Sequence, residues 1–269
     1  MKSCLNQATL LTADLETFLK AAKVARFDAI ELRTDKVQEN VRRKGRSETS
    51  DLVRSSGLEV VSLNALENFS IDRPQFPKMM DQAKEMIEAC EIVGCRTIIA
   101  ISAPLLSGLK EQEAIERTRD ALEKVVDLSS ERGINVCFEF LGFKSRCIRT
   151  LEEAWQVVKG LASAEVHLVI DTFHFHVGGS SLGALEQTPT QRISIVHIND
   201  VERKPPEELL DGDRVLPGEG VTNPRLLTDR LKARSYAGPL SVELFCEDYW
   251  KQDPLYIARK ARQSLEGLL

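Results

Sequence analysis

Short apolar runs alternate with longer amphipathic stretches along the whole chain, and this alternation constrains the fold more than any other feature. Runs such as TIIAIS and HLVID are almost continuously apolar, as is typical of strands that are covered on both faces. Strand–helix units repeated in this way predict a parallel sheet. The predicted strands are Ser3–Ala8, Asp28–Arg33, Glu59–Ala65, Thr97–Ser102, Asn135–Leu141, His167–Phe173, Ser194–Asp200 and Leu240–Phe245.

Helical periodicity is clearest in two of the stretches between these strands. In Met79–Val93 and Glu111–Arg132, apolar residues recur at i, i+3 and i+4, so each segment can bury one face. Thr150–Gly160 begins with Thr-Leu-Glu-Glu, which is a capping-box sequence. Gly57 and Gly94 each follow a helical run, a position where glycine often ends a helix.

Eight such units predict an α/β fold of the closed (β/α)8 TIM-barrel type, with a single domain over residues 1–269. An open doubly wound sheet is the alternative. Its dinucleotide-binding form typically carries GxGxxG after the first strand, and this chain has no such sequence there.

Composition limits the partners that we expect. The net charge of −5 and the pI of about 5.6 argue against nucleic acid, because duplex-binding proteins usually present a basic face. The first twenty residues lack the apolar run of a signal peptide, and no stretch is long enough to span a membrane. Six cysteines without a CxxC pair indicate reduced thiols. We therefore expect a cytoplasmic protein with no membrane partner, and a homo-oligomer stays open.

Four neighbouring strands end in a carboxylate or an imidazole. These residues are Glu139, Asp171, His197 and Glu243. In a barrel of this kind, the carboxyl ends of the strands form the active site. Three buried carboxylates would repel one another without a cation, so the set predicts one divalent metal ion, with Mn²⁺, Mg²⁺, Co²⁺ and Zn²⁺ all suited to oxygen and nitrogen ligands. The competing interpretation is a set of satisfied salt bridges in the core.

Other strand ends add polar groups. Glu31 and Arg33 alternate along the second strand and share one face. We expect Glu31 to form an ion pair behind the barrel mouth, and Arg33 and Asn64 to bind substrate. Arg214 lies in the long segment Glu202–Asn223, and loops of this length in compact domains are usually functional. We therefore expect Arg214 to reach the barrel mouth and bind substrate.

The strand-end sequences resemble the xylose isomerase-like TIM-barrel superfamily and, within it, the inosose isomerases of bacterial inositol catabolism. The matching segments are Cys4–Thr9, Ile30–Thr34, Leu63–Leu66, Phe138–Gly142, Asp171–His176, His197–Asp200, Asp213–Gly220 and Ser241–Phe245. The DxFHFH and DRVxPGxG patterns are fairly specific to this branch.

The resemblance implies that the metal ligands are the same four residues, that the ion is Zn²⁺ or Mn²⁺, and that His174 contacts substrate. It implies an isomerase that shifts a carbonyl of 2-keto-myo-inositol through an enediolate, with Glu139 and Glu243 as acid and base.

Two features depart from the inosose isomerase pattern. Gly142–Cys147 lacks an expected histidine and proline, and Arg203 resembles a substrate-binding arginine of ketose epimerases. A ketose 3-epimerase or an inosose dehydratase is therefore the main alternative. Two further readings are a non-catalytic sugar-binding barrel and a metal-dependent nuclease for abasic DNA. The four-ligand set argues against the first, and the small number of histidines against the second.

Overall fold

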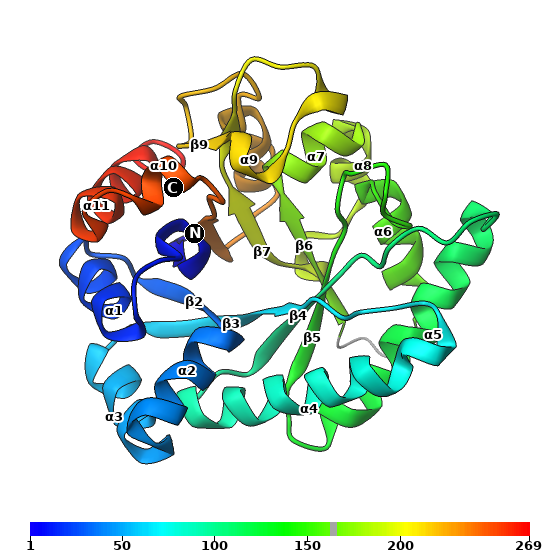
Figure 1. Ribbon diagram of the computed structural model, residues 1–269. Helices are drawn as coiled ribbons and strands as arrows, with labels where there is room; N and C mark the ends of the chain where they lie inside the picture. Colours follow the sequence, from blue (N-terminus) through cyan, green and yellow to red (C-terminus); the bar gives the residue numbers. More distant parts are fainter. Residues whose placement is uncertain (162–165) are drawn as a thin grey trace.

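The structure, a computed structural model, describes residues 1–161 and 166–269. Eight parallel strands form a closed barrel in which strands adjacent in the chain are also adjacent in space, and β1 closes against β10 (Figure 1). The strands are β1 (Lys2–Asn6), β2 (Ala29–Arg33), β3 (Glu59–Leu66), β4 (Thr97–Ile101), β5 (Asn135–Glu139), β6 (Val166–Asp171), β7 (Ile193–Ile198) and β10 (Pro239–Val242). This confirms the predicted barrel and contradicts the open sheet.

Helices surround the barrel (Figure 1). They are α1 (Leu15–Val24), α2 (Thr34–Lys44), α3 (Arg46–Ser56), α4 (Phe76–Val93), α5 (Glu111–Ser130), α6 (Leu151–Lys159), α7 (Thr172–Gly178), α8 (Leu182–Gln187), α9 (Pro224–Ala233), α10 (Glu247–Trp250) and α11 (Pro254–Ser264). The capping box at Thr150 and Glu153 forms as predicted. Gly57 and Gly94 end α3 and α4 with φ of 72° and 71°, values that favour glycine.

A small apolar cluster inside the barrel sets the level of the polar residues above it. Its buried members are Ile99, Cys137, Val169 and Ile195, one from each of β4, β5, β6 and β7. Side chains alternate along a strand, so the residue two positions further on points the same way. For three of these strands that residue is Glu139, Asp171 or His197. The inward-facing pattern therefore brings these three side chains to the carboxyl end of the barrel.

Most strand boundaries differ from the prediction by one to three residues, and two of these differences affect the site. The sixth strand ends at Asp171 rather than Phe173, because the Asp171 side chain accepts hydrogen bonds from the backbone N–H groups of Phe173 and His174 and so starts α7. His174 thus lies on a helix. The last barrel strand ends at Val242, which places Glu243 just beyond it.

The long segment after β7 folds back as a short antiparallel pair, β8 (Asp200–Val201) with β9 (Arg214–Val215). The Asp200 carboxylate accepts hydrogen bonds from the backbone of Gly218 and Thr222, which fixes the return of the chain. Arg214 is consequently buried, with 1% of its surface exposed.

All six cysteines are free thiols, as expected, and five are buried. Among the described helices, none has the length and apolarity needed to cross a membrane.

Candidate metal centre and substrate cavity

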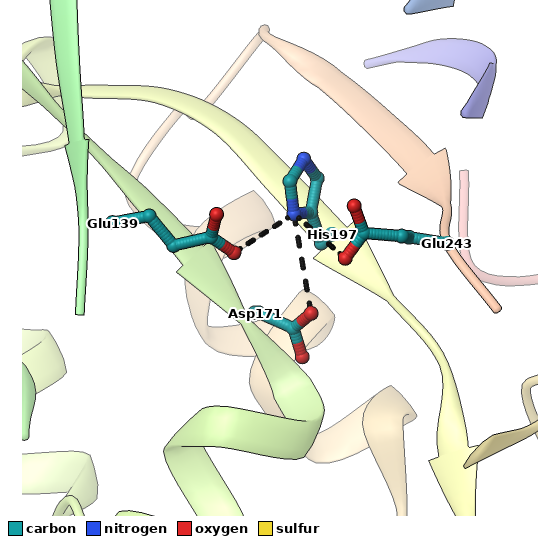
Figure 2. Close-up of side chains that lie close together, drawn as sticks. All are labelled: Glu139, Asp171, His197 and Glu243. Carbon is teal, nitrogen blue, oxygen red and sulfur yellow. Dashed lines mark hydrogen bonds and ion pairs between the residues drawn. The ribbon is translucent and has the colours of Figure 1, made fainter. Parts of the chain in front are cut away.

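Glu139, Asp171, His197 and Glu243 converge at the carboxyl end of the barrel (Figure 2). All four are buried, and one ligand atom from each lies within 4.8 Å of the others. The Nδ1 atom of His197 lies 3.0 Å from Glu139 Oε1, 3.2 Å from Glu243 Oε2 and 3.9 Å from Asp171 Oδ2. Figure 2 shows the two glutamates reaching this nitrogen from opposite sides. The four strand-end residues selected from the sequence thus form one cluster.

The electrostatics of the cluster call for a cation. Burial, together with the neighbouring carboxylates of Glu139 and Asp171, raises the pKa of Glu243 to about 8. Burial also raises the pKa of Glu139. Burial opposes charge on His197, but the surrounding carboxylates raise its pKa well above the usual value. Three carboxylate oxygens and one imidazole nitrogen match the donors that Zn²⁺ and Mn²⁺ accept, so these residues fit a divalent ion.

Both carboxylate oxygens of Asp171 have hydrogen-bond or ion-pair partners. Oδ1 caps α7 and accepts a hydrogen bond from Asn199 Nδ2 at 3.1 Å, while Oδ2 lies 3.2 Å from Arg214 Nη2. Burial alone would raise the pKa of Asp171, but the Arg214 guanidinium and the nearby imidazoles lower it below its ordinary range. Asp171 therefore stays ionised and immobile beside the other ligands.

A cavity of about 390 Å³ opens above the cluster. Small-molecule pockets have volumes of roughly 300 to 1,000 Å³, so a cavity of about 390 Å³ can hold a small molecule. Both Glu139 and Glu243 line it. The other lining residues are Arg33, Asn64, Ala65, Glu67, Ile101, Leu141, Phe143, Arg146, His174, Asp211, Arg214 and Phe245.

Of the residues predicted to bind substrate, Arg33, Asn64, His174 and Arg214 line the cavity. Arg203 does not: its side chain is exposed on the segment after β8. Its role as a substrate ligand stays a prediction without support from the cavity. Arg33 pairs with Asp35 and Glu67 rather than with Glu31. Glu31 is buried inside the barrel, and its ion-pair partner is His197.

His174 and Arg214 contact each other at the cavity wall. The backbone N–H of Gly142 lies 3.2 Å from His174 Nδ1, and Arg214 Nη2 lies 3.2 Å from His174 Nε2. Burial lowers the pKa of His174 to about 4, which keeps the ring neutral at pH 7. A neutral imidazole accepts at only one nitrogen, so the ring can accept from Gly142 or from Arg214 but not from both.

The sequence did not identify Phe143, Arg146 and Phe245 as cavity residues. Phe143 packs edge-on to His174 with the ring centroids 5.3 Å apart, and the Arg214 guanidinium lies 5.1 Å from the Phe245 ring centroid. Arg146 donates to the Ser102 carbonyl at 3.0 Å. The sequence held one indication of Phe143 and Arg146, since both lie in Gly142–Cys147, which departs from the family pattern. Loops that differ in this way often line a changed substrate pocket.

Barrel and cluster together define a (β/α)8 protein with a buried carboxylate–imidazole metal site at its mouth. The chain belongs to the xylose isomerase-like TIM-barrel family, whose model matches residues 19–268.

Two relatives and one solved structure resemble the chain over nearly its full length. It is 29% identical to the inosose isomerase of Bacillus velezensis, covering 100% of this chain and 97% of the relative. It is 30% identical to the inosose isomerase of Bacillus subtilis, covering 93% and 91%. A crystal structure of IolI protein with a bound zinc atom superposes with a TM-score of 0.94 and 28% identity, covering 100% and 98%.

Proposed function

We propose that this protein is a divalent-metal-dependent isomerase that moves a carbonyl group between adjacent carbons of a polyhydroxy ketone, with 2-keto-myo-inositol as the first candidate substrate. One observation carries the proposal: Glu139 and Glu243 belong to the ligand cluster and also line the cavity. The inosose isomerase relatives at about 30% identity supply the candidate substrate.

Glu139, Asp171, His197 and Glu243 are the residues that would hold the metal, with Zn²⁺ or Mn²⁺ as the proposed ion. Such an ion supplies Lewis-acid stabilisation of the negative charge that develops on the substrate oxygens. The zinc atom in the IolI crystal structure supports this choice of ion.

The two glutamates are the proposed proton carriers. One removes the proton from the hydroxyl-bearing carbon, and the same or the other glutamate returns a proton to the former carbonyl carbon, with an enediolate between the steps. Both carboxyl groups belong to the buried cluster and line the cavity. A side chain placed in this way can transfer a proton to or from a substrate carbon as a general acid or base.

Cavity side chains are proposed to orient the substrate. His174 and Arg214, which contact each other and line the cavity, would bind one substrate oxygen. Asn64 Oδ1 is buried without a hydrogen-bond partner among the described residues, so a substrate hydroxyl would satisfy it. Arg33, held by two carboxylates at the cavity edge, would donate to another hydroxyl.

A ketose 3-epimerase is the second candidate. Figure 2 shows Glu139 and Glu243 on two sides of His197, and proton removal on one face followed by return on the other inverts a carbon. An inosose dehydratase would use the same cluster and release water.

Proton exchange in D₂O, followed by NMR, tests the proposal. Zn²⁺- or Mn²⁺-loaded protein is incubated with 2-keto-myo-inositol and, separately, with a ketohexose. Deuterium next to the carbonyl together with a new inosose isomer is the expected result. Exchange with the ketohexose alone would replace the isomerase by the epimerase, and loss of water would indicate the dehydratase. No reaction with either compound would overturn the proposed substrate class.

A further inference from the structure

Glu31 is a fully buried carboxylate that the proposed reaction does not use. It lies on β2 with 0% of its surface exposed, and its two oxygens lie 3.1 and 3.2 Å from His197 Nε2. In the closed barrel, β1 and β10 separate β2 from β7. Glu31 therefore reaches His197 through the barrel interior rather than along the sheet.

Other donors hold the Glu31 carboxylate in place. Ser62 Oγ donates to Oε2 at 2.5 Å, and Asn6 Nδ2 donates to Oε1 at 3.1 Å. Asn6 Nδ2 also lies 2.9 Å from Oε1 of Glu243, a member of the ligand cluster. A carboxylate with this many donors cannot rotate away without leaving several buried polar groups unpaired. Its position is therefore fixed independently of any ion.

The two nitrogens of His197 face different partners. Nδ1 points to Glu139 and Glu243, whereas Nε2 points to Glu31, which is outside the four-residue cluster. An ionised carboxylate accepts hydrogen bonds only, so Glu31 favours the ring form with a proton on Nε2. In the neutral ring of that form, which metal binding requires, the Nδ1 lone pair is directed at the cluster.

We propose that Glu31 is a positioning residue that fixes the tautomer and the orientation of His197, so that Nδ1 is the metal-binding nitrogen. Carboxylates behind ligand histidines raise the basicity of the ring and lock its orientation, and their loss typically lowers metal affinity by about 10–100-fold. This inference rests on the metal centre of the proposed function but not on its substrate.

Metal affinity and histidine NMR test the role together. Glu31→Gln puts an amide, which carries donors, against Asn6 and Ser62, and it removes the charge behind His197. We expect its Zn²⁺ dissociation constant to rise by about 10–100-fold over wild type in a competition titration. The matched control is Asp28→Asn. It makes the same chemical change just before β2, at the opposite end of the barrel, where Asp28 accepts hydrogen bonds from Ser3. We expect its Zn²⁺ affinity to equal that of wild type.

A second measurement needs no variant. The chain has four histidines, so ¹⁵N-histidine labelling gives a readable spectrum. In wild-type protein loaded with ¹¹³Cd²⁺, we expect scalar coupling from cadmium to Nδ1 of His197 and a proton on Nε2. Coupling to Nε2 would overturn the inference even where Glu31→Gln does not fold. A Glu31→Gln protein that loses thermal stability but keeps wild-type Zn²⁺ affinity would reduce Glu31 to a structural residue. Failure of wild type to bind any divalent ion would instead overturn the metal centre itself.

Discussion

The two buried histidines of the site lie in regions of opposite electrostatic character. His197, with 0% of its surface exposed, faces carboxylates that raise its pKa well above the usual value. His174, with 3% exposed, lies beside Arg214 and packs edge-on against the rings of Phe143 and Phe173, and burial lowers its pKa to about 4. Both side chains are buried, so the difference between their pKa values comes from the charges of the neighbouring groups.

This difference separates two tasks within one cavity. The region around His197 gathers negative charge and suits a cation, whereas the region around His174 presents N–H donors and suits a substrate oxygen. Asp171 joins the two regions, because its Oδ2 atom lies 3.9 Å from His197 Nδ1 and 3.2 Å from Arg214 Nη2. The predictions below test this division, from the largest expected effect to the smallest.

Metal removal tests the His197 region most strongly. We expect chelation to lower turnover by at least about 10⁴-fold, because the Lewis acid and the placement of both glutamates are lost together. Re-addition of Zn²⁺ or Mn²⁺ should restore the rate, measured alongside the metal content of the protein. Near-full turnover in metal-free protein would contradict the assignment of cation binding to the His197 region.

Substitution of the two cluster glutamates is expected to have the next largest effect. Glu139→Gln and Glu243→Gln should each lower kcat by about 10²–10⁴-fold, the usual contribution of general acid–base catalysis. Metal content is measured in each variant to separate loss of the ion from loss of the proton carrier. Glu116→Gln on α5 is the matched control, because Glu116 is exposed and lies outside both the cluster and the cavity lining. An equal loss in the control would show that the effect is not specific to the cluster.

The free energy of unfolding should depend on pH because the pKa of His174 is lower in the folded protein than in the unfolded chain. In the unfolded chain its pKa is about 6.5, whereas in the folded protein it is about 4. Between these values the unfolded state binds the proton first, so stability falls as the pH drops from about 6.5 to about 4, by up to roughly 3 kcal/mol. His197 has the opposite sign: its raised pKa contributes stability below about 6.5 that is lost as the pH rises through the folded value.

Denaturant unfolding of metal-free wild type and His174→Gln at pH 7 and pH 4.5 measures this contribution. The variant should lose less stability on acidification than wild type does. The same pH dependence in both proteins would mean that His174 is not held neutral by its surroundings.

The sequence predicted that the four cluster residues converge, and strand periodicity accounts for three of them. Glu139, Asp171 and His197 follow the interior apolar residues by two positions, and parallel strands end at one level. The end of β6 was less predictable, since Asp171 serves both as a candidate ligand and as a helix cap.

The loops could not be placed from the sequence, because their positions depend on contacts between segments far apart in the chain. Pro104 and Arg146 form an isolated bridge between two βα loops, and that contact brings Arg146 to the cavity. Arg203 shows the converse. Arg203 resembles a substrate-binding arginine of ketose epimerases in sequence, but it follows the short strand β8 and its side chain is exposed.

Arg146 gives the smallest predicted effect and tests how far the His174 region extends. Its guanidinium donates to the Ser102 carbonyl and forms no ion pair with any described residue, so its other N–H groups are free to face substrate. Arg146→Gln should raise KM by about three- to tenfold with kcat nearly unchanged, as expected when one hydrogen bond made equally in ground and transition states is lost. Lys144→Gln, an exposed neighbour, is the control and should change neither constant. If kcat instead falls with KM unchanged, Arg146 acts on the reacting carbons, and the donor region then extends from His174 across the cavity to the β5–α6 loop.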